Sequence, residues 1–189
     1  MKRIALVGDI GSGKSYYSKL FGYPVFNADL VVSDIYKKNK YCFDNIKKKL
    51  PKFFSKFPLK KDELVNCILA NKVNIKKITK IVHPLVRKKL DLFIKKNKNK
   101  KIVILDIPLF FENRLNKKND IIIFIQSKKN IIVKKLLKRK NYNKKLMNKF
   151  KKIQWSSKMK KKKSDIIIKN HFDRKKAKKD VKNILKAII

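Results

Sequence analysis

Short apolar runs alternate along the chain with longer stretches in which apolar and polar residues follow a helical spacing. Five runs are predicted strands, at residues 3–7, 24–27, 101–106, 120–125 and 165–169. None alternates cleanly between apolar and polar residues, and the last three are rich in Ile and Val. This composition is typical of strands buried on both faces of a parallel sheet. With helical patterns between the strands, the sequence predicts a three-layer α/β fold around a five-stranded parallel sheet.

Three of the helical patterns have an apolar side. Residues 74–98 carry an approximate apolar stripe that Pro84 interrupts, so we predict two helices that break near His83. Residues 130–138 predict another helix, and residues 172–189 predict a terminal helix with Ala, Val, Ile and Leu on one side.

Two segments do not fit the alternation of strands and helices. Residues 31–100 are almost wholly helical between two strands, which is too long for one simple crossover, and we predict an inserted helical subdomain. Residues 140–163 are polar, rich in lysine and weakly periodic, and we predict a mobile flap, or lid. Its lysines at 160–163 are interpreted as a solvated run. We treat residues 1–189 as one domain that carries both segments, because this length supports one good core.

The net charge requires an interpretation. The chain has 54 Lys and Arg against 13 Asp and Glu, a formal net charge of +41. One interpretation is binding to nucleic acid or an anionic membrane. The other is compositional drift, because Lys, Asn and Ile are abundant and share A/T-rich codons. We favour drift, since the lysines are spread over nearly every connecting segment, and we expect no specific nucleic-acid partner.

The sequence favours a cytoplasmic protein. No apolar run approaches the length of a membrane span, and the four residues before Gly8 are too few for a signal peptide. Cys42 and Cys67 have no metal-binding spacing and are interpreted as reduced thiols. We expect no membrane partner and favour a monomer.

The stretch GDIGSGKS, residues 8–15, fits the phosphate-loop pattern G-x-x-x-x-G-K-S between a strand and a helix. Its backbone N–H groups can surround a β-phosphate, Lys14 would reach the β- and γ-phosphates, and Ser15 would bind Mg²⁺. The motif therefore predicts ATP with Mg²⁺ and says little about the phosphate acceptor. The predicted ATP-binding residues of the loop are Gly11, Ser12, Gly13, Lys14 and Ser15.

Two carboxylates stand at the ends of predicted strands. Asp29 lies just past the strand at 24–27, where it could accept a proton from a substrate hydroxyl or hold Mg²⁺ through water. It could equally be the N-cap of the following helix. Asp106 ends the strand at 101–106, where phosphate-loop enzymes place a second carboxylate that organises Mg²⁺.

Three further residues have both a chemical and a structural interpretation. His83 could act in a site, but by itself it is better explained as the cap of a helix that Pro84 begins. Glu112 follows the third strand, and its structural interpretation is a solvated helix start. Arg139 closes a helix ahead of the flap, where its planar cation could move onto the transferring phosphoryl group. The alternative is one more surface charge.

Together these motifs resemble the dephospho-coenzyme A kinase family, in order and spacing, from residue 4 to about residue 170. The resemblance implies transfer of the ATP γ-phosphoryl group to the ribose 3′-hydroxyl of dephospho-coenzyme A. This reaction gives coenzyme A and ADP and is the last step of coenzyme A biosynthesis. The matching segments are Gly8 to Ser15, Asn27 to Asp29, His83-Pro84, Asp106 to Glu112, Arg139, Gln154 and Ser164 to Asn170.

The resemblance also implies roles for single residues. Lys14, Asp29 and Arg139 would be catalytic, with Asp29 as the base and Arg139 as the lid arginine that approaches the phosphates. Asn170 matches the residue near the adenine site, so it joins the ATP-binding set. His83 and Glu112 fall on the acceptor side. The segment 31–100 would then bind the acceptor, and 140–163 would be the lid.

The chain departs from the family pattern at several positions. Asn27 replaces the first Asp of D-A-D, and Asp9 replaces a glycine, which places a negative charge beside the phosphates. Lys135 and Lys160 stand for lid arginines and lose the bidentate fork, which predicts weaker closure on ATP. Three alternatives therefore stay open: another small-molecule or nucleotide kinase, a weakly active kinase, and a non-catalytic basic protein that binds nucleotides and nucleic acid.

Overall fold

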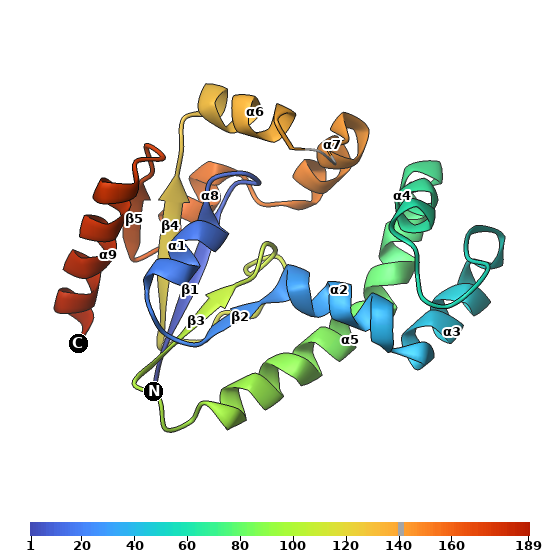
Figure 1. Cartoon of the computed structure of the whole chain (residues 1–189), viewed down its shortest axis with the longest axis horizontal. Coiled ribbons are helices and arrows are strands. Elements are labelled where there is room, and N and C mark those ends of the chain that lie inside the picture. The colour runs from blue at the N-terminus through green and yellow to red at the C-terminus, as the bar shows by residue number, and fades with distance from the viewer. Residues whose placement is uncertain (140–141) are drawn as a thin grey trace. The chain divides into compact units, whose positions relative to one another are not determined.

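The computed structural model describes residues 1–139 and 142–189. Five strands form one sheet in the order β2-β3-β1-β4-β5, and every pair of neighbours is parallel (Figure 1). This confirms the predicted five-stranded parallel sheet and the α/β class. The strands are β1 (Lys2–Gly8), β2 (Val25–Asn27), β3 (Ile102–Asp106), β4 (Asp120–Gln126) and β5 (Ile166–Lys169).

Strand β1 lies at the centre of the sheet. Its neighbours on both sides, β3 and β4, come from much later in the chain. Lys2 is opposite Ile102 of β3, and Arg3 is opposite Asp120 of β4. All five residues of β3 are buried, as the continuous apolar run in the sequence predicts. The Arg3 guanidinium also pairs with the Asp120 carboxylate at 2.9 Å, which fixes the start of the two strands.

The chain divides into two compact units. The first holds the sheet and comprises the described residues of 1–27, 97–143 and 149–189. The second comprises residues 28–96 and 144–148 and is helical. Its helices within 28–96 are α2 (Ala28–Lys38), α3 (Lys40–Lys49), η1 (Pro51–Phe53), α4 (Lys61–Ala70) and α5 (Lys72–Lys96).

The core of the sheet unit lies between the strands and two helices, α1 (Lys14–Leu20) and α9 (Arg174–Ile188). Tyr17 of α1 and Val181 of α9 are nearly inaccessible to solvent and contact isoleucines of the sheet. Each such side chain contributes about 1.5–3 kcal/mol through burial. The remaining helices among the described residues are α6 (Lys129–Leu137), α7 (Lys144–Ile153), whose first five residues belong to the helical unit, and α8 (Ser157–Lys162).

The helical unit has a core of its own, which explains why a long polar-looking segment folds. Helices α2, α3 and α4 each pack against α5. The buried residues of this core are Ile35, Cys42, Phe43, Ile46, Leu50, Phe54, Leu59, Leu64, Cys67, Ile78 and Val82.

The predicted break at Pro84 is wrong, because α5 continues through it. An interior proline removes one backbone hydrogen bond and costs a helix about 3 kcal/mol. The apolar stripe is not interrupted, since Ile78 and Val82 before the proline and Leu90 after it are all buried. Burial of three such side chains at about 1.5–3 kcal/mol each outweighs the loss at the proline.

The segment predicted as a flap is largely helical in its described part. Helices α7 and α8 occupy most of residues 142–163, while the first two positions of the predicted lid, 140 and 141, lie outside the described residues. Within the described ranges, no helix is long and apolar enough to span a lipid bilayer.

Candidate active site

The loop between β1 and α1 turns on glycines with positive φ. Gly11 has a φ of 87° and Gly13 a φ of 96°, a region that residues with a side chain rarely adopt. Gly13 is the N-cap of α1, so the loop leads directly into that helix. The Ser12 N–H donates to the Asp9 carbonyl at 3.0 Å and closes the turn. The loop therefore has the strand–loop–helix context that a phosphate-binding motif requires.

Lys14 is folded back along this loop. Its side-chain Nζ donates to the Gly8 carbonyl at 3.1 Å and to the Asp9 carbonyl at 3.2 Å, and the residue is largely buried. Ser15, the next residue of α1, is exposed. The ammonium is thus held beside the loop, and the Ser15 hydroxyl is open to a ligand.

Two residues that follow other strands donate hydrogen bonds to the backbone of the loop. Asn170, directly after β5, donates from Nδ2 to the Ser12 carbonyl at 2.8 Å, and its Oδ1 accepts from the Phe172 N–H at 2.7 Å. Ser127, directly after β4, donates from its hydroxyl to the same Ser12 carbonyl at 3.0 Å. Asn170 therefore supports the backbone of the phosphate loop, a contact that the sequence did not predict.

The Ser12 side chain is a buried polar group of the loop. Its hydroxyl is buried and has no hydrogen-bond partner among the residues that the structure describes. A buried hydroxyl in this state is unfavourable unless a ligand completes it. A phosphate oxygen would do so.

The strands β2 and β3 end in a hydrogen-bonded pair. The Asn27 Nδ2 donates to the Asp106 Oδ2 at 2.7 Å, and the Asp106 side chain is buried. Asn27, which stands where the family pattern has the first Asp of D-A-D, is thus a neutral donor to Asp106. Asp29 follows two residues later, exposed and in the first turn of α2.

A second polar cluster is centred on Glu112, which follows β3. Its Oε1 accepts from the Trp155 backbone N–H at 2.6 Å and lies 3.8 Å from the Lys160 Nζ. Lys160 also donates to the Gln154 Oε1 at 3.2 Å, and the ring of Trp155 stacks on Phe111 with centroids 5.3 Å apart. The prediction that Lys160 is solvated is wrong: its side chain is 1% exposed, because Glu112 supplies a compensating charge.

Arg139 and His83 lie outside these clusters. Arg139 is exposed and follows the C-cap of α6. His83 lies within α5 rather than at a helix start, so the predicted capping role is wrong. Its side chain is half-buried, and burial lowers its pKa, with a smaller contribution in the same direction from Arg87.

The sequence profile of dephospho-CoA kinases matches residues 2–176. The chain belongs to the dephospho-CoA kinase family. It is 30% identical to the dephospho-CoA kinase of Wolbachia pipientis wMel over 190 residues, covering 98% of this chain and 97% of the relative. Two solved structures share its fold, TT1252 from Thermus thermophilus (22% identity, TM-score 0.79) and the dephospho-CoA kinase of Campylobacter jejuni (24% identity, TM-score 0.67). Each alignment covers 100% of this chain and 98% of the other.

Family membership removes two of the three alternatives left open by the sequence. The chain is an ATP-dependent phosphotransferase of the dephospho-CoA kinase family, which acts in coenzyme A biosynthesis. A purely nucleic-acid-binding role and an unrelated small-molecule kinase are therefore set aside. Both solved structures match the fold over the full length of this chain.

Two residues of the site, Ser127 and Trp155, were missed by sequence reasoning, because neither carries a motif. Lys160 was singled out as a replacement for a lid arginine, but its burial against Glu112 was not foreseen. Ser127 and Trp155 did leave a signal. Ser127 is the first residue beyond a strand at its carboxyl end, and Trp155 is the single tryptophan of the chain. Large aromatic residues in a lysine-rich segment rarely lack a packing partner.

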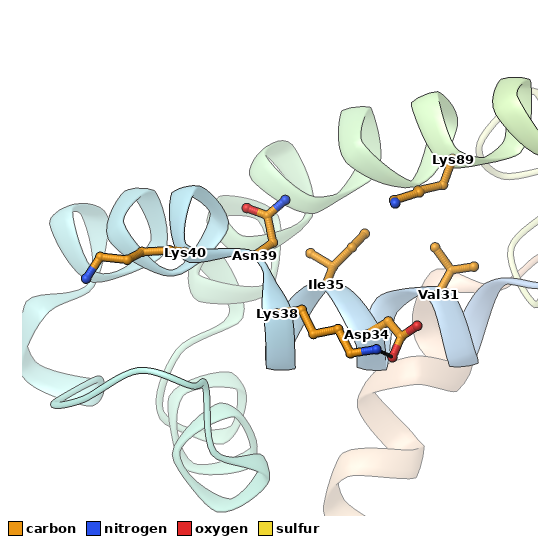
Figure 2. Close-up of a pocket in the computed structure, with 7 residues that line it drawn as sticks. All are labelled: Val31, Asp34, Ile35, Lys38, Asn39, Lys40 and Lys89. Atoms are coloured by element: carbon orange, nitrogen blue, oxygen red, sulfur yellow. Dashed lines mark ion pairs between the residues drawn. The ribbon is translucent and has the colours of Figure 1, made fainter.

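A pocket of about 510 Å³ lies in the helical unit, within the predicted acceptor-binding segment 31–100 (Figure 2). Figure 2 shows the Lys38 ammonium next to the Asp34 carboxylate, and the two are 3.6 Å apart. Three lysines against one carboxylate give the pocket a positive charge. Its lining residues are Val31, Asp34, Ile35, Lys38, Asn39, Lys40 and Lys89.

Proposed function

We propose that this chain transfers the γ-phosphoryl group of ATP to the ribose 3′-hydroxyl of dephospho-CoA. The observation that carries the proposal is the phosphate loop, whose positive-φ glycines and largely buried Lys14 are backed by Asn170. Gly11, Ser12, Gly13, Lys14 and Ser15 would hold the triphosphate. The unpartnered Ser12 hydroxyl supports this set, because a phosphate oxygen would supply its missing acceptor.

Lys14 supplies the charge that the reaction needs at the loop. Its Nζ donates hydrogen bonds to two backbone carbonyls. Exchange of one of these carbonyls for a phosphate oxygen would replace a neutral acceptor by a charged one. As the γ-phosphoryl group leaves the β-phosphate, negative charge grows on the bridging oxygen. A fixed cation there stabilises the transition state more than the ground state.

Mg²⁺ fits the residues present. The Ser15 hydroxyl and the Asp106 carboxylate are hard oxygen donors of the kind that Mg²⁺ prefers, with phosphate oxygens completing the set. Asn27 donates to the Oδ2 of Asp106 and so helps to orient this carboxylate. When bound, the ion would neutralise charge on the β- and γ-phosphates. We propose Ser15 and Asp106 as its protein ligands.

Asp29 is proposed as the base. Its carboxylate would take the proton of the 3′-hydroxyl while the hydroxyl oxygen forms the new bond to the γ-phosphorus. The bond from that phosphorus to the β,γ-bridging oxygen breaks, and ADP leaves. Asp29 is exposed at the carboxyl end of β2, the edge at which ligands of parallel sheets bind.

The Asp29→Asn variant tests this role. We expect kcat to fall by at least about 100-fold while the KM for ATP stays within about twofold, because the lost group acts only on the acceptor proton. Asp34→Asn is the matched control, since Asp34 is another exposed carboxylate on the same helix. Native turnover by Asp29→Asn would show that the base lies elsewhere.

The remaining roles are proposed from the family pattern. Arg139 would stabilise the transferring phosphoryl group, and Asn170 would border the adenine besides bracing the loop. Glu112 and His83 would contact the acceptor. Glu112 has one buried oxygen, Oε2, without a hydrogen-bond partner among the described residues, which suits a donor from the acceptor. The cytoplasmic location, the monomeric state, the acceptor-binding role of 31–100 and the lid role of 140–163 stay predictions.

The acceptor is tested directly with the purified chain and Mg-ATP. We expect dephospho-CoA to be converted to a product heavier by one phosphoryl group, and nucleoside monophosphates, shikimate and gluconate to stay unchanged. The position of the new phosphate on the ribose is read by phosphorus NMR. Activity on a nucleoside monophosphate alone would refute the proposal, and weak turnover of dephospho-CoA would support the weakly active alternative.

A further inference from the structure

Asp9 is the residue of the phosphate loop that the motif leaves unexplained, and the structure shows how its charge is accommodated. Its Oδ2 accepts a hydrogen bond from the hydroxyl of Ser157, the first residue of α8, at 2.6 Å. A hydroxyl–carboxylate bond of this length is charge-assisted and stronger than a neutral one. A side chain of the loop is therefore joined to a segment 148 residues later in the chain.

The same helix carries a buried cation. Lys160 lies on α8 with its side chain 1% exposed, and its nearest carboxylate is Glu112. Burial lowers the pKa of Lys160, whereas the carboxylates of Glu112 and Asp9 raise it. Asp9, hydrogen-bonded to Ser157 on the same helix as Lys160, is thus the second carboxylate that favours the charged ammonium. By the same interaction, the ammonium offsets part of the Asp9 charge.

We infer that Asp9 is a positioning residue whose carboxylate, held by Ser157 and offset by Lys160, ties the phosphate loop to residues 154–160. The inference rests on the proposed binding of ATP at this loop. Residue 9 also supplies a backbone carbonyl to the Lys14 Nζ at 3.2 Å. The bond between the Asp9 carboxylate and Ser157 therefore helps to fix a backbone carbonyl that orients the Lys14 Nζ. It also directs the negative charge of Asp9 at α8.

This arrangement predicts an asymmetry between variants. Loss of Lys160 leaves the Asp9 carboxylate without its cation beside the triphosphate site, so the like charges repel and ATP binds more weakly. Loss of the Asp9 charge as well removes the source of the repulsion. A structural role of Lys160 alone, in holding Glu112 or Gln154, gives no reason for such a rescue.

The experiment measures binding of a non-hydrolysable ATP analogue with Mg²⁺ to the full chain by titration calorimetry. We expect Lys160→Met to raise the Kd at least about tenfold, and Asp9→Asn/Lys160→Met to recover most of that loss. Lys161→Met is the control, because it removes an exposed lysine from the same helix at the same change in net charge. In turnover assays, the KM for ATP should rise in Lys160→Met and return towards the wild-type value in Asp9→Asn/Lys160→Met.

A second pair of variants covers the case in which Lys160→Met fails to fold. Ser157→Ala removes the hydroxyl that holds the Asp9 carboxylate and should raise the Kd about fivefold, and Asp9→Asn/Ser157→Ala should raise it no further, because both changes act on the same bond. An Asp9→Asn/Lys160→Met variant that binds no better than Lys160→Met, or losses that add in Asp9→Asn/Ser157→Ala, beside normal binding by the wild-type chain, would overturn the inference alone. Failure of the wild-type chain to bind the analogue would overturn the proposed function together with it.

Discussion

Replacement of Gly13 by alanine is the sharpest test of how the phosphate loop is built. Gly13 has a φ of 96°, and an added Cβ would lie 2.5 Å from the Asn170 Nδ2. The left-handed conformation costs a residue with a side chain about 1–2 kcal/mol. Displacement of Asn170 would break its bonds to Ser12 and Phe172, at about 1 kcal/mol each. The expected loss of unfolding free energy is about 3–4 kcal/mol, a fall in Tm of about 6–16 °C for a chain of this size.

The structure also predicts that this loss is not additive. Asn170→Ala alone should cost about 2 kcal/mol, and the double variant with Gly13→Ala about 3–4, rather than the sum of about 5–6, because the clash has gone. Gly22→Ala is the control, since Gly22 has a φ of 71° but nothing within 4 Å of an added Cβ, so it reports the strain alone. The assay is urea or thermal unfolding of the wild-type chain and these four variants. Strict additivity would refute the reasoning.

Three further predictions follow from single side chains. Burial lowers the pKa of His83 below its ordinary 6.5, so the folded chain binds this proton less readily than the unfolded chain. The unfolding free energy should therefore fall as the pH drops below 6.5. Between pH 7.5 and pH 5, His83→Gln should lose less unfolding free energy than the wild-type chain. Burial raises the pKa of Cys42 to about 11 and also raises that of Cys67, so mass spectrometry should find neither alkylated by iodoacetamide at pH 8 until the chain is unfolded. Asn27→Asp would place a second carboxylate against Asp106. At pH 8 we expect it to lower the unfolding free energy by about 1–3 kcal/mol, and addition of Mg²⁺ to restore it. An unchanged unfolding free energy without Mg²⁺ would mean that the two carboxylates separate.

The sheet could be predicted from the sequence because its strands appear there as short, nearly continuous apolar runs. The run at 101–106 is apolar from end to end, and a strand buried on both faces produces such a run whatever surrounds it. The phosphate loop could be predicted because its glycines and Lys14 are required by backbone geometry and charge within eight consecutive residues. In both cases the cause is local.

What could not be predicted depends on distant partners. Lys160 looks like any other lysine of its run, and only the carboxylate of Glu112, 48 residues earlier, decides that it is buried. Pro84 looks like a helix breaker, and only the packing of α5 against its neighbours keeps the helix continuous. Asp9 looked like a charge opposed to ATP until Ser157 supplied its partner. Each error follows from a tertiary contact that overrides a sound local preference.

The central place of β1 has a consequence for synthesis on the ribosome. Its first pairing partner, β3, begins at Ile102, and its second begins at Asp120. A nascent chain of about 100 residues has therefore released the central strand of the sheet with neither neighbour made, while the whole helical segment 28–96 is already complete. Such long-range pairing slows folding and leaves apolar edges exposed meanwhile. We expect pulse proteolysis of stalled chains to find residues 28–96 protected before residues 2–8.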